Sequence, residues 1–433
     1  MGRVSDETKI ELLAPAGGPD QLRAAVNFGA DAVYLAAEHF GMRAAAENFN
    51  AKTLAEGIKF AHEHNVKVYV TCNILMHDAD IENLRAFIKQ LSEAEADAVI
   101  VGDLGALATA REVAPNLDIH VSTQASVANT ASAIEYAKMG AKRIILAREM
   151  SLKEIAGLRK NLDAAGYADT PGNPNALALE AFVHGAMCMS VSGRCLISSY
   201  LTGRSANKGA CTQPCRWGYK LLEEKRDGQE FEIGEDGFGT YIMNSKDMNM
   251  LEHIDDLKAA RLSSIKIEGR NKKALYVATV VNAYRHVLDG EDALTWSREL
   301  ENVSHRPYST GFYFGPAEQS PDYDGYEQNC VHVGDVLECE KRSTFFGLQR
   351  FNIYKVLCRN HFEEGETLEA LIPGGNIASV NVENLKWYPD DKSGGKPTQV
   401  ANRAKDIYSF TSNIPLPPGT LLRSKTYLRT SRH

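Results

Sequence analysis

The sequence has no uninterrupted run of about 18 apolar residues, the minimum expected of a helix that crosses a membrane. Its first residues, MGRVSDETKIELLAP, also lack the apolar core of a secretory signal peptide. We therefore expect a cytoplasmic protein that has no membrane partner. In that reducing compartment disulfides are rare, so clustered cysteines favour metal ligands or nucleophiles.

Positive charge is not in excess either, because 48 Lys and Arg residues stand against 56 Asp and Glu residues and the formal net charge is −8. Such a balance argues against indiscriminate binding of nucleic acid. A local basic face stays open, since binding depends on where the cations are concentrated. The chain has no low-complexity tract, and 44% of its residues are hydrophobic, as expected of a globular protein.

Eight short apolar runs rich in β-forming residues occur before about residue 290. They span residues 10–17, 32–36, 66–73, 98–101, 118–124, 143–150, 177–185 and 263–270. All but the seventh are followed by helical periodicity, which indicates parallel strands joined by crossover helices. Eight such units in roughly 250 residues predict an α/β fold of the (β/α)8 TIM-like barrel type. A doubly wound sheet is the competing fold, but no glycine-rich phosphate sequence follows the first strand.

The rest of the chain predicts a second domain. We assign residues 1–290 to the barrel, with a long cysteine-bearing insertion at 184–220 after the seventh strand, and residues 291–330 to an irregular connecting segment. From residue 331 to 433 the hydrophobic pattern has period two, and the short strands are separated by Gly and Pro turns. This pattern predicts a small C-terminal antiparallel β-barrel domain.

Polar side chains occupy the ends of the predicted barrel strands. They are Asn73, Gln124, Arg148, Glu149, His184, Glu268 and Arg270. Barrel enzymes carry their chemistry at the C-terminal ends of the strands, so these residues predict a site there. A single polar residue at a strand end is often only a helix cap or a turn former. The set is therefore a stronger argument than any member.

Four of the eight cysteines lie close together, as Cys188-x6-Cys195-x15-Cys211-x3-Cys215. A structural zinc site usually uses two short C-x2–4-C pairs, and only one short pair is present. A catalytic thiol would need a base such as His184 and would leave three thiols unexplained. An iron–sulfur cluster accepts four thiolates at wider, uneven spacing, so the spacing modestly favours a cluster.

The same segment, residues 188–219, contains four basic residues and no acidic one. These cations either compensate the charge of the thiolates or form a face for the phosphates and bases of an RNA loop. The basic tail at 422–433 adds further candidates. The predicted RNA-binding residues are Arg204, Lys208, Arg216, Trp217, Arg423, Lys425 and Arg429.

Five motifs resemble the collagenase-like peptidase family U32, most closely its members that hydroxylate uridine in transfer RNA. They are ELLAPAGG, FVHGAMCMSVSGRCLISSYLTGRSANKGACTQPCRWGY, YIMNSKDM, IKIEGR and SHRPYSTGFYFG, and the likeness covers nearly the whole chain. The resemblance implies formation of 5-hydroxyuridine at the wobble position of tRNA, dependence on prephenate, and a 4Fe-4S cluster. It also implies that the cluster ligands are Cys188, Cys195, Cys211 and Cys215.

Prephenate carries two carboxylates, which bidentate arginines bind well. The candidate substrate-binding residues are Arg43, Gln124, Arg148, Arg194 and Arg270. Some of these arginines could instead only pair with Glu149 or Glu268. His184 and Glu268 are the candidates for moving protons, and for His184 a structural role is an equal alternative.

Two other functions stay open. The family name suggests a peptidase, although the sequence has neither a G-x-S-x-G elbow nor an H-E-x-x-H helix. A non-catalytic tRNA-binding protein with a structural cluster is the third hypothesis. Besides tRNA and prephenate, a paralogous family member is a further candidate partner.

Overall fold

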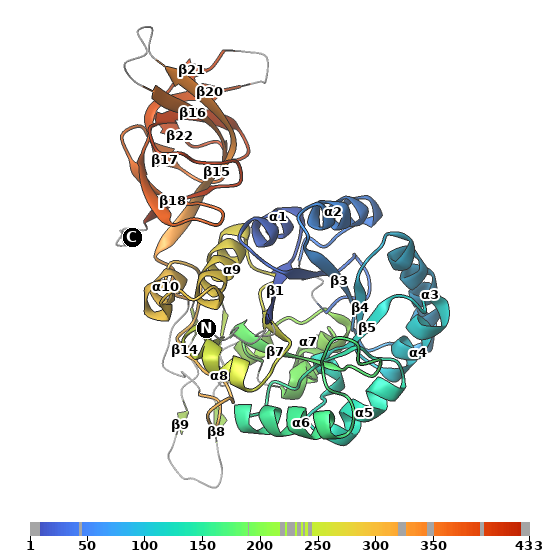
Figure 1. Ribbon diagram of the computed structural model, residues 1–433. Coiled ribbons are helices and arrows are strands. Elements are labelled where there is room, and N and C mark those ends of the chain that lie inside the picture. Colours follow the sequence, from blue (N-terminus) through green and yellow to red (C-terminus); the bar gives the residue numbers. More distant parts are fainter. Residues whose placement is uncertain are drawn as a thin grey trace, which may run out of the picture.

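The computed structural model of the chain describes residues 9–42, 46–188, 190–216, 221–222, 230–231, 235–236, 239–240, 245–318, 326–343, 350–389 and 394–425. The predicted barrel is confirmed: eight parallel strands form a ring in the order β13-β1-β2-β3-β4-β5-β6-β7, and β13 also pairs with β7. Figure 1 shows this ring with its helices outside. The strands are β1 Glu11–Ala16, β2 Ala32–Leu35, β3 Lys67–Cys72, β4 Ala98–Val101, β5 Asp118–Val121, β6 Arg143–Ile145, β7 Ala178–Gly185 and β13 Ser264–Ile267.

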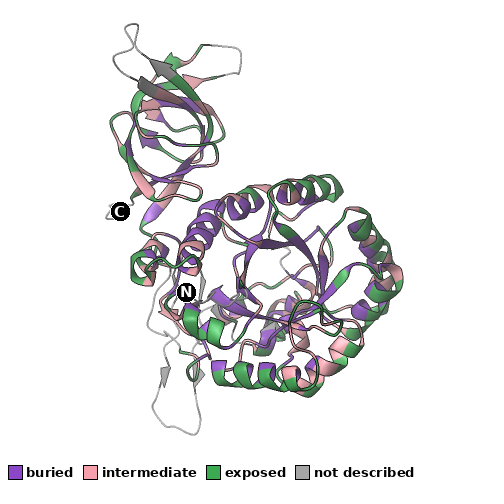
Figure 2. Ribbon diagram, in the orientation of Figure 1, coloured by how far each residue is buried: buried purple, intermediate pink, exposed green. Residues whose placement is uncertain are grey.

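The outer helices begin at polar caps and bury one face against the strands. The side chains of Asn50, Asp103, Asn129 and Ser151 accept hydrogen bonds from the first turns of α2, α4, α5 and α6. The helices are α1 Pro19–Asn27, α2 Ala51–Glu63, α3 Asp78–Glu93, α4 Leu104–Val113, α5 Thr130–Lys138, α6 Leu152–Ala164, α8 Ile254–Ala259 and α9 Ala274–Leu288. Figure 2 shows buried strands inside and exposed outer helix faces. Among the described helices, none is both long and apolar enough to cross a membrane.

A long excursion separates β7 from β13, as the sequence predicted. It contains the short helices η2 Val191–Gly193, α7 Ile197–Thr202, η3 Ala206–Lys208, η4 Pro214–Arg216 and η5 Leu251–His253. It also contains the strand pairs β8 Leu221–Leu222 with β9 Glu230–Phe231, and β10 Glu235–Asp236 with β11 Gly239–Thr240. Strand β12 Asp247–Asn249 then returns antiparallel to the end of β7.

The predicted irregular connection at 291–330 contains one regular helix, α10 Ala293–Leu300. Asp292 caps it by accepting a hydrogen bond from Thr295 N, and the side chains of Trp296 and Leu300 are buried. The Tyr, Pro and Gly residues that indicated irregular structure lie after this helix. Strand β14 Tyr308–Ser309 follows and pairs in parallel with β12.

The C-terminal region is an antiparallel β structure with a hydrophobic core of its own, as predicted. Eight strands form one sheet in the order β19-β18-β24-β15-β16-β23-β20-β21, and β17 pairs with β22. They are β15 Cys330–Ser343, β16 Arg350–Cys358, β17 Phe362–Glu363, β18 Thr367–Leu371, β19 Ile377–Asn381, β20 Glu383–Tyr388, β21 Lys396–Pro397, β22 Val400–Ala401, β23 Ile407–Ser412 and β24 Leu421–Lys425. Closure of this sheet into a barrel stays a prediction.

Candidate active site at the barrel mouth

A small cavity of about 50 Å³ lies at the C-terminal ends of the barrel strands. Its polar lining consists of Tyr34, Thr71, Asn73, Ser122, Thr123, Gln124, Arg148, Lys266, Glu268 and Arg270. Five of these residues were predicted from the strand ends, and the closed ring of strands brings them together. The position agrees with the general location of active sites in (β/α)8 barrels.

Arg148 is held in place on three sides. Its Nη2 lies 3.3 Å from Glu268 Oε2, and its Nη1 donates a hydrogen bond of 3.2 Å to the carbonyl oxygen of Ala186. The guanidinium also stacks over the ring of Phe182, 3.9 Å from the centroid. Its Nε is buried and has no hydrogen-bond partner in the described part of the chain. The side chain is therefore oriented and still has a donor to offer.

Arg270 reaches the cavity because glycines make room for it. The residue is 4% exposed, and its Nη1 donates to Thr71 Oγ1 at 3.4 Å. A Cβ on Gly17, in the ELLAPAGG motif, would lie 1.9 Å from the Arg270 carbonyl oxygen. A side chain on Gly17 would thus collide with backbone, so this glycine permits the close approach of the two strand ends.

Lys266 is a cavity residue that the sequence analysis missed. It precedes Glu268 by two positions, and strand alternation directs both side chains into the barrel. Its Nζ lies 3.0 Å from Glu180 Oε1 and 4.1 Å from the centroid of the Tyr34 ring. Burial lowers the pKa of Lys266, although the charge of Glu180 opposes this shift. The alternation in SSIKIEGR was the signal that could have identified it.

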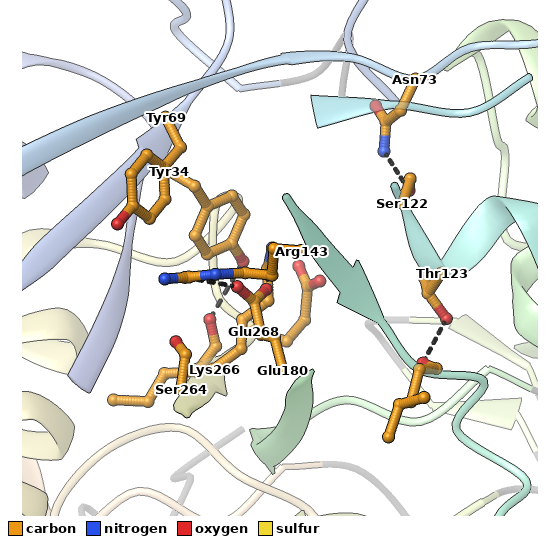
Figure 3. A network of polar contacts seen from close by, with 12 residues as sticks. Tyr34, Tyr69, Asn73, Ser122, Thr123, Arg143, Glu180, Ser264, Lys266 and Glu268 are labelled. Carbon is orange, nitrogen blue, oxygen red and sulfur yellow. Dashed lines mark hydrogen bonds and ion pairs between the residues drawn. The ribbon is translucent and has the colours of Figure 1, made fainter. Parts of the chain in front are cut away.

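Beneath the cavity, charged groups compensate one another inside the barrel. Arg143 Nη1 lies 2.5 Å from Glu11 Oε1 and 3.0 Å from Glu180 Oε2, and Figure 3 shows Arg143 and Lys266 approaching Glu180. Burial tends to raise the pKa of Glu11, but the charge and hydrogen bonds of Arg143 outweigh it and hold the pKa below its usual value. Two carboxylates thus balance the two cations Arg143 and Lys266.

At the mouth itself the cations are in excess, because Arg148 and Arg270 stand against the carboxylate of Glu268. Asn73 donates to Ser122 Oγ at 3.1 Å, while its Oδ1 is buried with no hydrogen-bond partner in the described structure. Buried polar atoms are nearly always hydrogen-bonded in folded proteins. The unpaired atoms of Asn73 and Arg148 therefore indicate that the cavity takes a polar occupant, and the charge favours an anion.

A larger cavity of about 1140 Å³ opens at the opposite end of the barrel. Its lining includes Lys9, Glu11, Asp169, Arg261 and Arg285, from the N-terminal ends of the strands and the adjoining helices and loops. Chemistry in this fold takes place at the other face, and polar residues at this end generally serve stability. We therefore place the site at the smaller cavity.

His184 does not lie in the cavity, and its predicted role at the mouth is wrong. The residue is 1% exposed and is surrounded by the rings of Tyr276, Tyr284 and Tyr308, with centroid distances of 6.1, 5.6 and 5.5 Å. Burial lowers the pKa of His184 to about 3. The end of β7 pairs with both β12 and β13 here, and the β13 register shifts, so the period-two pattern of the strand fails at this residue.

The cysteine segment, residues 188–216, is anchored on the barrel mouth. Glu149 accepts hydrogen bonds from Ser192 N at 2.6 Å and Ser192 Oγ at 3.0 Å. Leu75 N donates to the carbonyl oxygen of Asn207 at 2.8 Å. Gly209 lies against the loop after β2 with φ of +82°, and a Cβ there would be 2.7 Å from the carbonyl oxygen of Gly41. Glu149, predicted as a site residue by its strand end, thus holds the segment rather than lining the cavity.

None of the four cysteines of this segment, all of which the structure describes, is in a disulfide. Cys188 and Cys211 are exposed, Cys195 and Cys215 are partly buried, and Gln213 N donates to Cys211 Sγ at 3.4 Å. Four thiols on one segment, with a backbone N–H directed at one sulfur, fit the donor chemistry of an iron–sulfur cluster. Among the described residues, however, no three His, Cys, Asp or Glu side chains are gathered into a metal site.

The predicted RNA-binding residues have different environments. Arg204 is exposed, and Lys208 forms an ion pair with Asp80. Lys425 is 63% exposed and lies 3.1 Å from Glu369. Arg194, predicted to bind substrate, is exposed and does not line the cavity.

Arg423 is a second correction, because its side chain is 1% exposed and its Nη2 lies 2.7 Å from Glu299 and 2.9 Å from Glu369. The guanidinium of Arg423, which was predicted to bind RNA, thus forms ion pairs with these two carboxylates. Three predicted residues lie outside the described residues, namely Arg43, Trp217 and Arg429. Of Arg216, only the backbone is described.

Apolar side chains on the cysteine segment are unusually exposed. Val191 is 66% exposed, Leu196 75%, Tyr200 89% and Leu201 44%. Contiguous exposed apolar groups often mark a binding surface. The exposure of these side chains was not predicted, because the sequence of a short helix does not show whether an apolar residue faces a core or solvent.

Comparison with known proteins identifies both domains. The sequence model of peptidase family U32 matches residues 17–322, and that of the peptidase family U32 C-terminal domain matches residues 328–423. The tRNA hydroxylation protein P1 of Bacillus subtilis is 33% identical over 96% of this chain and 94% of its own length. The tRNA hydroxylation protein P of Escherichia coli is 34% identical over 87% and 90%. A protein of Porphyromonas gingivalis named collagenase is 33% identical, again over 87% and 90%.

Proposed function

The chain belongs to peptidase family U32, and on that premise we propose that it is an RNA-hydroxylating enzyme. In finer detail, we propose that it forms 5-hydroxyuridine at the wobble position of tRNA with prephenate as co-substrate. The observation that carries this proposal is a cationic cavity at the strand ends, with a basic segment that contains four cysteines held on the loops of the same barrel mouth. Relatives that are named as tRNA hydroxylation proteins, and that match this chain along nearly their full lengths, support it.

The cavity residues suit an organic acid. Arg148 and Arg270 would bind a carboxylate, and Glu268 would keep Arg148 oriented. A volume of about 50 Å³ holds only a small polar group, so the 2-oxo carboxylate end of the acid would enter while the rest of the acid faces the cysteine segment. Glu268, which lines the cavity and lies beside Arg148, would also exchange protons with the substrate.

The proposed cluster ligands are Cys188, Cys195, Cys211 and Cys215. When bound, a 4Fe-4S cluster would supply one-electron chemistry next to the cavity. After anaerobic purification we expect about four iron atoms and matching acid-labile sulfide per chain. Cys211→Ser should lose most of the iron, whereas Cys339→Ser, a partly buried thiol of the C-terminal domain, should keep it. Zinc in place of iron in the wild-type protein would contradict the cluster.

The exposed face of the cysteine segment is the proposed RNA contact. Tyr200 offers a ring for base stacking, and Arg204 offers a cation for phosphate. Tyr200→Ala should weaken tRNA binding by about 1–3 kcal/mol, the usual value of one stacked base. Leu294→Ala, which removes another exposed apolar group (63% exposed, against 89% for Tyr200) from α10, is the control. Equal affinity of both variants in a filter-binding titration would exclude Tyr200 from the contact.

Nucleoside mass spectrometry of tRNA tests the function itself. A deletion strain should lack 5-hydroxyuridine and its derivatives, and the wild-type gene should restore them. Arg148→Ala should not restore them, although its tRNA binding should be unchanged. Normal levels of the nucleoside in the deletion strain, with no duplicate gene present, would refute the proposal.

The collagenase-named relative supports peptide hydrolysis as a second candidate. Cleavage of a collagen-like peptide should then persist through purification to homogeneity and disappear in Arg148→Ala or Glu268→Gln. A non-catalytic tRNA-binding protein would instead bind tRNA without hydroxylating it, and folded Cys195→Ala would bind as tightly as the wild type. These outcomes separate the three functions.

A further inference from the structure

The amine of Lys266 has no role in the function proposed above. We propose that Lys266 is a catalytic nucleophile, whose Nζ forms a reversible Schiff base with the ketone of a 2-oxo acid bound in the mouth cavity. The inference rests on the proposed function in one respect, namely that the acid is prephenate, which carries a 2-oxo carboxylate side chain. It assigns to this barrel a covalent step that substrate binding by the arginines does not require.

The depth of the side chains supports this assignment. Lys266 is 3% exposed and lines the cavity one inward-facing position deeper on β13 than Glu268. In a 2-oxo acid the ketone carbon is bonded directly to the carboxylate carbon. Arg148, Arg270 and Lys266 line one small cavity, so a 2-oxo acid whose carboxylate is bound by the two arginines would place its ketone carbon in the cavity that Lys266 also lines.

The surroundings of Nζ are those of a reactive amine. It lies 4.1 Å from the centroid of the Tyr34 ring and 5.4 Å from that of Phe182, and both rings line the cavity. The two ring faces stabilise a cation and exclude water from it. Burial also lowers the pKa of the amine, so less free energy is needed to form the neutral nucleophile.

A purely structural role explains Lys266 poorly. Glu180, its ion-pair partner at 3.0 Å, already pairs with Arg143 at 3.0 Å. A buried ion pair seldom stabilises a fold more than well-packed apolar residues of the same volume. Lys266 also faces a cavity rather than packed core, and an ion pair in that position is more easily explained by chemistry than by stability.

The proposed step balances without an oxidant. Glu180 Oε1 accepts a proton from the ammonium, and the neutral amine adds to the ketone carbon to form a carbinolamine. The proton returns to the hydroxyl group, which leaves as water while the carbon–nitrogen double bond forms. The ammonium at the start and the iminium at the end are both cations, so the ion pair with Glu180 is present before and after the step. The iminium then withdraws electrons from the neighbouring carbon of the acid until hydrolysis reverses the step.

Borohydride trapping tests this step on the full-length protein. Protein purified anaerobically is incubated with prephenate or with pyruvate, the simplest 2-oxo acid, and then reduced, digested and analysed by mass spectrometry. We expect an adduct on the peptide that contains Lys266, with the added mass of the acid less one oxygen atom. Lys266→Arg, which keeps the charge, should abolish the adduct. Lys138→Arg, on the outer face of α5, should not.

The outcomes distinguish this inference from the proposed function. If prephenate-dependent tRNA hydroxylation proceeds and no reduced adduct forms on Lys266, the inference is refuted and the function stands. An adduct on Lys266 without tRNA hydroxylation keeps the inference and refutes the function. Adducts on other lysines alone also refute the inference. If Lys266→Arg does not fold, the wild-type digest still tests the inference, because it identifies which lysine carries the adduct.

Discussion

At the residue scale, His184 shows how surroundings set a charge state. Three tyrosine rings enclose its imidazole, and Asp247 is the nearest group that would favour the charged form. Burial outweighs this attraction and lowers the pKa of His184 to about 3. The folded protein therefore holds a neutral imidazole across the physiological range, whereas an unfolded chain would protonate it near pH 6.5.

We expect this difference to make stability fall in acid. Below about pH 6.5 the unfolded chain binds a proton at His184 that the folded chain does not bind. Stability from this residue is thus complete above pH 6.5 and declines by about 1.4 kcal/mol per pH unit toward pH 3. Urea midpoints at pH 7.5 and 5.5 measure the loss, which should shrink in His184→Phe.

His361→Gln, in the C-terminal domain, is the control for that measurement, because His361 has an exposed side chain. It should retain nearly the whole wild-type difference between the two pH values. An undiminished pH-dependent loss in His184→Phe would show that the histidine is already accessible to protons in the folded state.

The sequence predicted the site residues whose positions depend on local features of the chain. It did not predict those whose positions depend on contacts between residues far apart in sequence. Gln124, Arg148, Glu268 and Arg270 were placed correctly at the mouth because strand ends are a local feature of the chain. The burial of Arg423 depends on Glu369 and Glu299, which lie 54 and 124 residues away in sequence. No local pattern indicates that such carboxylates will meet a tail arginine.

At the scale of elements, the docking of the cysteine segment depends on a few specific contacts. Its hydrogen bonds join it to the loops after β3 and β6, and Gly209 fits against Gly41 after β2. These anchors hold the cysteine segment on the loops of the barrel mouth, although the segment has little regular structure. All eight barrel strands were predicted because each has its own apolar run. The anchors were not, because backbone contacts between loops leave no mark on composition.

Gly209→Ala should loosen this docking. The added Cβ would meet the Gly41 carbonyl oxygen, and a left-handed backbone costs a non-glycine residue about 1–2 kcal/mol as well. We expect faster hydrogen exchange at the Leu75 amide, which bonds Asn207 in the segment. The melting temperature of the barrel should change little.

Gly203→Ala is the matched control, since Gly203 also has a positive φ, of +69°, but nothing lies within 4 Å of its Cβ position. Gly203→Ala therefore has the same cost of a left-handed backbone, but its Cβ does not collide with a neighbouring atom. Equal exchange rates at Leu75 in both variants would indicate that the approach to Gly41 does not hold the segment.

At the scale of the whole molecule, ion pairs join the C-terminal domain to the barrel. Arg423 on β24 bonds Glu299 on α10, and Arg359 after β16 lies 2.7 Å from Asp20 on α1. The two domains could be predicted separately because each has its own hydrophobic period. Their junction could not, because it joins residues far apart in sequence, namely these charged side chains and the apolar Leu371 and Leu421, which are buried in the hydrophobic cluster of the barrel.

Arg423→Ala should weaken this junction strongly. Removal of this buried cation takes the arginine partner from Glu299 and leaves Glu369 with only the exposed Lys425, at a cost of about 3 kcal/mol. We expect a lower melting temperature and unchanged affinity for tRNA. Lys425→Ala removes an exposed cation from the same Glu369 and should have no measurable effect on melting. A selective loss of tRNA affinity in Arg423→Ala would restore the RNA-binding role that burial argues against.

The position of β13 in the ring has a consequence for synthesis of the protein. This strand closes the barrel by pairing with β1 and β7, yet it follows β7 only after the whole cysteine-bearing excursion. On the ribosome the four thiols therefore emerge before the strand that completes the ring. A nascent chain has an open barrel and accessible cysteines at the same time, and that interval ends when Ser264–Ile267 are added.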